Sequence, residues 1–446
     1  MSDVIKLKQG LDIRLKGKSE TVYGQASLPE LYAIKPTDFF GLKPKMAVKE
    51  GDKVKAGDVL FFDKQQPDVK FVSPVSGEVS AIVRGDRRAI LRVVVKAEGE
   101  QAPAEVGKMD AGSATRQQVV EKLLSTGAWT YLRQRPYNVV ADPTRTPKAI
   151  FVSTFDTAPL APDYNFVILG NEAAFQAGID ALSKIAPVTV ANHGIGCNKA
   201  FANVKGARVV SFSGAHPAGC VGVQINHVDP INAGETVLTI GVQEVVAIGK
   251  IFSDGKHDFG RVAVLVGSEV QKPAYYRTIL GAQVSPIVKA ANSDNVRIIS
   301  GNVLTGTAIK ADDFLGFYDA QITVIPEGNE AEFLGWITPG LNKFSLSRTF
   351  FSWLTGKKEY ALDTNTHGEP RAIVVSGEME SVFPMDIYPE HLIKAILAKN
   401  IDKMIELGIF EVVEEDMALC EFVSTSKLPV QRILRNGLSL MMQEVG

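Results

Sequence analysis

The sequence predicts a multi-domain protein that combines α/β and α+β units, and three observations support this fold class. The chain has 446 residues, which is too long for one hydrophobic core and indicates roughly three to four domains. Short β-rich segments fill the first hundred residues, whereas strand-like and helix-like segments alternate between residues 148 and 252. From Pro389 onward, apolar residues recur at helical spacing.

The composition excludes several classes of protein. Hydrophobic residues make up 45% and charged residues 22% of the chain, as in ordinary globular proteins, and the formal net charge is only −2. A nucleic-acid partner is therefore not expected. Cys197, Cys220 and Cys420 are far apart and form no C-x-x-C pair that would indicate a metal site. The sequence shows no signal-peptide pattern and no apolar run of about 18 residues, so we expect membrane attachment only through partner proteins.

The first predicted domain, residues 1–110, is rich in short strands. The segments V-K-E-G-D-K-V-K-A-G-D-V-L-F and S-P-V-S-G-E-V-S-A-I place apolar residues between glycine turns. They resemble the barrel-sandwich hybrid fold of lipoyl and biotinyl carrier domains. The carrier lysine would correspond to Lys64, but its spacing to Ser73 is longer than in carriers, and Pro67 lies between them. We therefore expect an unmodified structural domain, with a carrier as the weakest alternative.

A second predicted domain, residues 111–257, follows a small, polar linker. Thr115 is expected to open an amphipathic helix that ends at Gly127. Apolar strands then alternate with helices, a pattern typical of a Rossmann-like parallel α/β sheet. The expected strands lie at 149–153, 187–191 and 207–212, and the expected helices at 172–184 and 241–252. No G-x-G-x-x-G follows the first strand, and Asn192–Gly196 is only a weak glycine loop, so a classical NAD site is not expected.

The segment from Ser211 to Ile231 places four residues with special backbone properties directly after a strand. These residues are Gly214, Pro217, Gly219 and Gly222. Such a loop can bring backbone amides against an anion or another surface, and two histidines, His216 and His227, flank it. The simpler alternative is a tight turn between strands with His216 hydrogen-bonded inside it. We expect the glycines to set the backbone shape rather than to act in catalysis.

Residues 258–355 are predicted to form a β-grasp unit, with short strands around a helix-like segment at Ala274–Leu280. Within it, V-x-K-P-x-Y-x-R-T-I-L-G-A and R-I-I-S-G-N-V-L-T-G-T resemble the soluble-ligand-binding (SLBB) type of β-grasp module. The aromatic-rich segment from Phe333 to Trp353 is expected to be a partly packed loop or, if exposed, an interface.

Residues 356–446 are predicted to form a helical domain, in which Gly408 ends one helix and Pro429 starts the last one. These helices resemble the iron–sulfur domain of the Rnf complex C subunit and of the NADH-binding subunit of respiratory complex I. Only Cys420 is present where a cluster needs four thiolates. The unit therefore resembles a ferredoxin domain without its cluster.

The whole chain resembles the family of A subunits of the Na+-translocating NADH:quinone oxidoreductase. The most specific motif is G-A-H-P-A-G-C-V-G-V-Q-I-N-H-V-D-P-I at 214–231, supported by segments at 272–282, 300–307 and 384–392. The resemblance implies a peripheral subunit on the cytoplasmic side of the cell membrane, in a complex that oxidises NADH, reduces quinone and exports Na+. Other subunits of that complex would be its partners and would carry the flavins and the iron–sulfur cluster.

Flavin-binding relatives carry a G-G-A-x-F-P or G-R-G-G-x-G-F loop, whereas this chain has T-G-A-W-T-Y-L-R-Q-R-P at 126–136. Bulky side chains thus replace glycines, and we expect no bound redox cofactor, no metal and no catalytic residue in this chain. We expect a docking and scaffold role instead. The alternative function is that of a soluble flavoprotein that binds NADH and FMN itself.

Quinone is the one ligand that we expect to meet this chain. A quinone needs an aromatic slot for its ring and a hydrogen-bond donor for each carbonyl group. The stretch 128–137 supplies both, although its arginines could equally form an ion-pair network. The predicted quinone-binding residues are Trp129, Tyr131, Arg133 and Arg135, with His216 as a weaker candidate.

Overall fold

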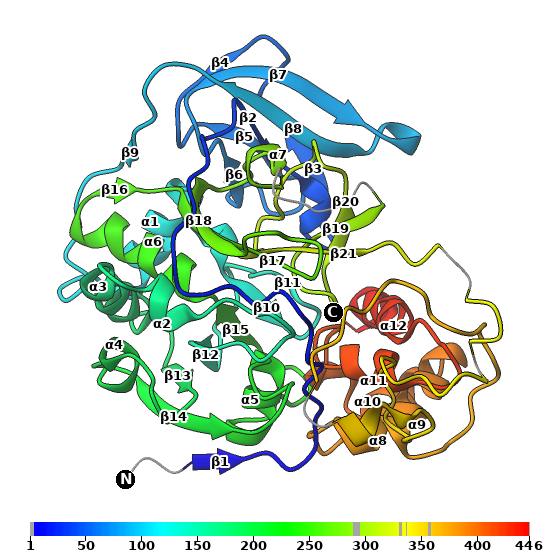
Figure 1. Ribbon diagram of the computed structural model, residues 1–446. Coiled ribbons are helices and arrows are strands. Elements are labelled where there is room, and N and C mark those ends of the chain that lie inside the picture. Colours follow the sequence, from blue (N-terminus) through cyan, green and yellow to red (C-terminus); the bar gives the residue numbers. More distant parts are fainter. Residues whose placement is uncertain (1–3, 289–294, 330–331, 336, 356–357, 446) are drawn as a thin grey trace.

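The computed structural model describes residues 4–288, 295–329, 332–335, 337–355 and 358–445 (Figure 1). Four structural units are visible: a β-rich unit, an α/β unit, a second β-rich unit and a helical unit near the C-terminus. In the part of the chain that the structure describes, no helix is both long enough and apolar enough to cross a membrane.

The first unit consists of two small antiparallel sheets that enclose a hydrophobic core. One sheet has the order β2 (Leu31–Ile34), β8 (Ile90–Ala97), β7 (Gly77–Arg84) and β4 (Lys53–Val54). The other has the order β3 (Pro44–Met46), β5 (Val59–Asp63) and β6 (Lys70–Val72). Leu60, Phe71 and Val79, one from each of three strands, are at most 1% exposed, so alternate side chains of these strands fill the interior as predicted.

The α/β unit is built on a seven-stranded sheet. Its order is β1 (Val4–Lys6), β14 (Arg208–Ser213), β13 (Val188–Asn192), β12 (Ala149–Ser153), β15 (Val237–Ile240), β10 (Arg133–Arg135) and β11 (Val139–Val140). The first five strands are parallel, and the last two are antiparallel to their neighbours. Because β1 pairs with β14, the N-terminal strand belongs to this sheet and not to the first β-rich unit.

Seven helical segments connect or flank the strands of the α/β sheet. They are α1 (Arg116–Ser125), η3 (Ala128–Tyr131), α2 (Tyr164–Val167), α3 (Glu172–Leu182), α4 (Lys199–Ala202), α5 (Val221–Val228) and α6 (Val242–Ser253). Thr115 caps α1, as predicted, because its side chain accepts a hydrogen bond from the Gln118 amide. Helices α3 and α6 pack closely: a Cβ at Gly249 would lie 1.7 Å from the Ala174 carbonyl oxygen.

The second β-rich unit contains a mixed five-stranded sheet. Its order is β18 (Ala274–Ile279), β17 (Gly260–Val266), β21 (Gln321–Pro326), β19 (Val296–Ser300) and β20 (Thr307–Ile309), with the short helix α7 (Ser285–Val288) beside it. The prediction of a helix at Ala274–Leu280 was wrong, because this segment is β18. Aromatic and β-branched residues dominate it, and pairing with β17 along its whole length satisfies its backbone.

The helical unit contains the longest helix of the described chain and confirms two predicted boundaries. Its helices are α8 (Glu378–Val382), α9 (Pro389–Leu397), α10 (Ile401–Glu406), α11 (Ala418–Val423) and α12 (Val430–Glu444). Gly408 has φ = +82° just after α10, and Pro429 directly precedes α12. Leu392, Leu434 and Met441 are fully buried between these helices.

Candidate functional site

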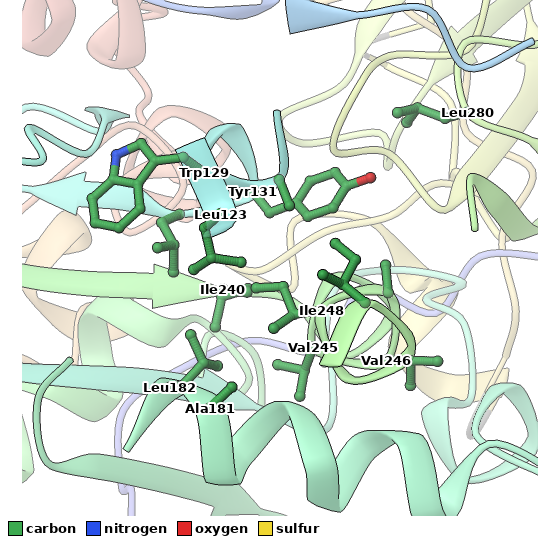
Figure 2. Packing of buried hydrophobic residues seen from close by; sticks show 14 of the residues in the cluster. Leu123, Trp129, Tyr131, Ala181, Leu182, Ile240, Val245, Val246, Ile248 and Leu280 are labelled. Carbon is green, nitrogen blue, oxygen red and sulfur yellow. The ribbon is translucent and has the colours of Figure 1, made fainter. Parts of the chain in front are cut away.

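The aromatic–basic stretch from Trp129 to Arg135 is buried in the interior. Trp129, Tyr131 and Arg135 are each at most 2% exposed. Figure 2 shows the rings of Trp129 and Tyr131 in the hydrophobic cluster that also contains Leu123 and Ile248. These aromatic side chains therefore contribute to the core of the protein.

The polar atoms of these aromatic residues are bonded within the chain. The indole Nε1–H of Trp129 donates to the Ala141 carbonyl oxygen at 2.7 Å. His257 Nδ1 lies 3.1 Å from the Thr126 carbonyl, which can only accept, so Nδ1 carries the proton and Nε2 accepts from the Tyr131 hydroxyl at 2.8 Å. Burial lowers the pKa of His257 to about 3, in agreement with a neutral ring.

The same stretch contacts each of the other three units. A Cβ at Gly127, just before it, would lie 2.6 Å from Val72 of the first β-rich unit. In the second β-rich unit, the Tyr318 hydroxyl donates to the Thr130 carbonyl at 2.7 Å, and the Arg133 guanidinium lies 4.8 Å from the centre of the Tyr318 ring. We call residues 127–135 the central joint, because it holds the units together.

The contact with the helical unit is ionic. Arg135 Nη1 donates to Asp416 Oδ2 at 2.7 Å, and Nη2 donates to Glu415. Asp416 also accepts from the Val413 amide at 3.0 Å. Burial raises the pKa of Asp416, whereas the nearby Arg135 lowers it. Since Trp129, Tyr131 and Arg135 already have partners, quinone binding by these residues stays a prediction that would require the central joint to open.

The turn after β14 places His216 in the interior. His216 is 4% exposed, its backbone amide donates to Asp12 at 3.0 Å, and its Nδ1 lies 3.1 Å from the Thr157 hydroxyl. Burial lowers the pKa of His216 to about 4, so the ring is neutral at physiological pH. These bonds attach the N-terminal segment and the loop after β12 to the turn.

Two of the glycines in this region are required by close packing. Gly222 lies in α5, so its assignment to a loop was wrong: the apolar run V-G-V-Q-I forms a buried helix face directly after the turn. A Cβ at Gly222 would lie 2.3 Å from the Asp416 carboxylate, and one at Gly219 would lie 2.6 Å from the Thr157 amide nitrogen. Gly214 has φ = +150°, and a Cβ there would lie 2.9 Å from Leu7. Pro217 lies in the same turn, where its carbonyl accepts from the Cys220 amide at 2.9 Å.

Sequence reasoning missed a cleft of about 660 Å³ at the carboxyl ends of β12 and β13. The loop after β12 contributes Thr154–Thr157, and the loop after β13 contributes His193 and Cys197. Ligands of parallel α/β sheets commonly bind at this edge. Burial raises the pKa of Asp156 in the cleft to about 6. The glycine loop at Asn192–Gly196 was the only signal for it in the sequence.

Among the residues that the structure describes, no group of three or more His, Cys, Asp or Glu side chains is arranged to hold a metal ion. Cys220 and Cys420 are buried, and burial raises the pKa of both thiols. Cys197 is partly exposed in the cleft.

Comparison with known proteins gives matches along most of the chain. Residues 5–98 match the NqrA N-terminal barrel-sandwich hybrid domain, residues 114–257 the NqrA second alpha/beta domain, and residues 262–311 the NQRA C-terminal domain. The sequence is 39% identical to the A subunit of the Na(+)-translocating NADH-quinone reductase of Pseudomonas aeruginosa over 446 residues, covering 99% of this chain and all of the relative.

Other relatives and one solved structure are also similar to the chain. The corresponding A subunits of Yersinia pestis bv. Antiqua and Hahella chejuensis are 39% and 38% identical, again over 99% of this chain and the whole of each relative. Among solved structures, an NAD+-reducing [NiFe]-hydrogenase shares 15% identity, with a TM-score of 0.32 over 75% of this chain and 59% of the other, which is too low to support an argument.

Proposed function

The chain belongs to the family of A subunits of the Na+-translocating NADH-quinone reductases, and from this premise we propose that it is a docking and scaffold subunit that carries no redox cofactor itself. It is thus one subunit of an oxidoreductase complex that transports Na+. Its position on the cytoplasmic side of the membrane, held by membrane-embedded partners, is part of the proposal.

The packing of the central joint carries the proposal that no flavin is bound. A phosphate cradle needs glycines whose backbone amides a ligand can approach. The one glycine of the joint, Gly127, faces Val72 of the first β-rich unit instead. The positions after it carry Trp129 and Tyr131, which fill the interior. FMN phosphate therefore does not fit at this place.

A scaffold role follows from the same contacts. Residues 127–135 hold four units in one arrangement through ionic, aromatic and hydrogen-bonded contacts. Units joined in this way can present a constant surface to partner subunits, and they can form one wall of a quinone site whose main part lies on those partners. Arg133 is the predicted quinone residue with the most exposed side chain, because the other four are buried.

Purification of the chain with and without its partners tests this function. Alone, it should show no flavin absorption, no iron, and no mass shift at Lys64. Together with the membrane subunits it should co-purify in fixed stoichiometry. Stoichiometric flavin in the isolated chain would support the alternative, a soluble flavoprotein that oxidises NADH. Failure to co-purify with the membrane subunits would refute the docking role.

A further inference from the structure

Residues 333–335 and 337–354, which we call the aromatic loop, expose an unusual number of large apolar side chains. Phe333, Ile337, Leu341, Phe351, Trp353 and Leu354 are each at least 50% exposed, and Phe333 is 89% exposed. Residue 336 lies outside the described part of the chain. In Figure 1 the loop, in yellow, runs along the outside of the helical unit. Exposed apolar groups in such number indicate a contact surface.

The loop is held in place by its own contacts and by the helical unit. The Phe351 amide donates to the Pro339 carbonyl at 2.9 Å, so the segment between these two residues closes on itself. Lys343 donates to the Gly335 carbonyl. Phe344 packs on Phe422 of α11 with ring centres 5.5 Å apart. The exposed side chains are therefore presented by a folded loop.

The charge of the loop has one sign. The sequence has no Asp or Glu between positions 333 and 358 but four basic residues, Lys343, Arg348, Lys357 and Lys358. Glu332, just before the loop, pairs with Lys343, and Lys358, just after it, donates to the Asn342 side chain and the Leu341 carbonyl. Arg348 is exposed and has no carboxylate partner from the loop itself. Arg348 lies 5.6 Å from the centre of the Trp353 ring. Apolar and aromatic side chains interleaved with cations, without acids, are typical of segments that lie in the interfacial layer of a membrane.

We propose that the aromatic loop inserts its apolar side chains into the interfacial layer of an anionic membrane, while the exposed Arg348 contacts the lipid headgroups. A protein partner has both acidic and basic residues and would not require the absence of carboxylates over the whole segment. A negatively charged lipid surface repels carboxylates, so it favours a segment that has none. The inference goes beyond the proposed function, which assigns membrane attachment to partner subunits.

Flotation of the isolated full-length chain with lipid vesicles tests this inference. Vesicles of equal parts phosphatidylcholine and phosphatidylglycerol should carry the protein to the top of the gradient, and pure phosphatidylcholine should carry less. Each basic residue at the surface contributes about a fivefold gain in partitioning, which high salt should reverse. Because no partner subunit is present, this test can fail while co-purification with the membrane subunits succeeds.

Variants identify the side chains responsible. Ile337→Ser, Phe351→Ser and Trp353→Ser together should lower partitioning by at least about tenfold. The matched control is Ile195→Ser, since Ile195 is 95% exposed but lies outside the loop, and it should change nothing. Unchanged circular dichroism and melting would show that the triple variant is folded. No flotation of the wild type, or equal flotation of the triple variant, would overturn the inference. If the wild type binds no vesicles and the triple variant no longer co-purifies with the membrane subunits, the loop belongs to a protein interface instead.

Discussion

Arg135 and Asp416 are 281 positions apart in the sequence, yet they form a buried ion pair with 2.7 Å between Nη1 and Oδ2. The two side chains are 1% and 0% exposed. Neither charge is exposed to water, so the Asp416 carboxylate depends on Arg135, whereas Arg135 also has Glu415 as a second partner. This pair connects β10 of the α/β sheet to the helical unit.

Removal of either partner should therefore be costly. We expect Arg135→Met to lower the free energy of unfolding by about 3–5 kcal/mol, because the Asp416 carboxylate would remain buried without a counter-ion. Asp416→Asn should cost less, because Glu415 still pairs with Arg135 in that variant. The double variant Arg135→Met, Asp416→Leu should lose clearly less than the sum. Urea unfolding followed by circular dichroism measures these values. The exposed pair Lys403–Glu406 provides the control, since Lys403→Met should leave the transition unchanged. Additive losses in the double variant would contradict the prediction.

Local patterns in the sequence were sufficient for many elements. The cap at Thr115 and the boundaries at Gly408 and Pro429 depend on side chains and backbone angles close in sequence, and they were predicted correctly. Ala274–Leu280 was predicted as a helix, although its aromatic and β-branched residues are common in strands. The segment is a strand because it pairs with β17, and this pairing cannot be recognised from the seven residues alone.

The candidate site depends on contacts between distant segments, and for this reason the sequence could not define it. Trp129 and Arg135 have the residue types of a ligand site, but their partners Ala141 and Asp416 place them inside the protein. The cleft near His193 combines the segments 18–22, 154–165 and 193–197 with Tyr275 of β18. Since each loop alone has an ordinary composition, only the folded chain reveals the cleft.

The glycines at 219 and 222 provide a second prediction. Ala in place of Gly222 would put a Cβ 2.3 Å from the Asp416 carboxylate, and Ala in place of Gly219 would put one 2.6 Å from the Thr157 nitrogen. Each substitution should lower the free energy of unfolding by about 1–3 kcal/mol, although Ala favours a helix at position 222. Gly368→Ala is the control, because its nearest neighbour is 3.6 Å away on the flexible Lys427 side chain. Unchanged melting temperatures of both variants would refute this prediction.

The buried His216 predicts a specific pH dependence. Its pKa is about 4 in the folded state and near 6.5 when unfolded, so the unfolded chain binds more protons between these values. The neutral His216 ring makes its full contribution to the free energy of unfolding above pH 6.5. This contribution, about 1–3 kcal/mol in total, is lost as the pH falls toward 4. His216→Gln should therefore be less stable than the wild type at pH 8, with a deficit that shrinks at pH 5. The exposed His367 serves as control, and a deficit that is constant with pH would argue against a neutral buried His216.

The predicted quinone contact can be separated from the structural role of the central joint. Trp129→Phe removes the donor to Ala141, so it should lower the free energy of unfolding by about 1–3 kcal/mol and leave quinone affinity unchanged. Arg133→Ala removes a partly exposed cation that stacks on Tyr318. This variant should lower the affinity for quinone.

A photoreactive quinone on the intact complex, with the labelled peptides mapped, measures the second effect. We expect most label on the membrane subunits, since a long-tailed quinone dissolves in the bilayer. Label on this chain should lie in the peptide that contains Arg133 and should decrease severalfold in Arg133→Ala but not in Trp129→Phe. Label at the cleft near His193 would move the quinone contact away from the central joint. No label on this chain, together with unchanged quinone affinity in Arg133→Ala, would leave only the scaffold role, because the candidate with the most exposed side chain would then make no contribution to quinone binding.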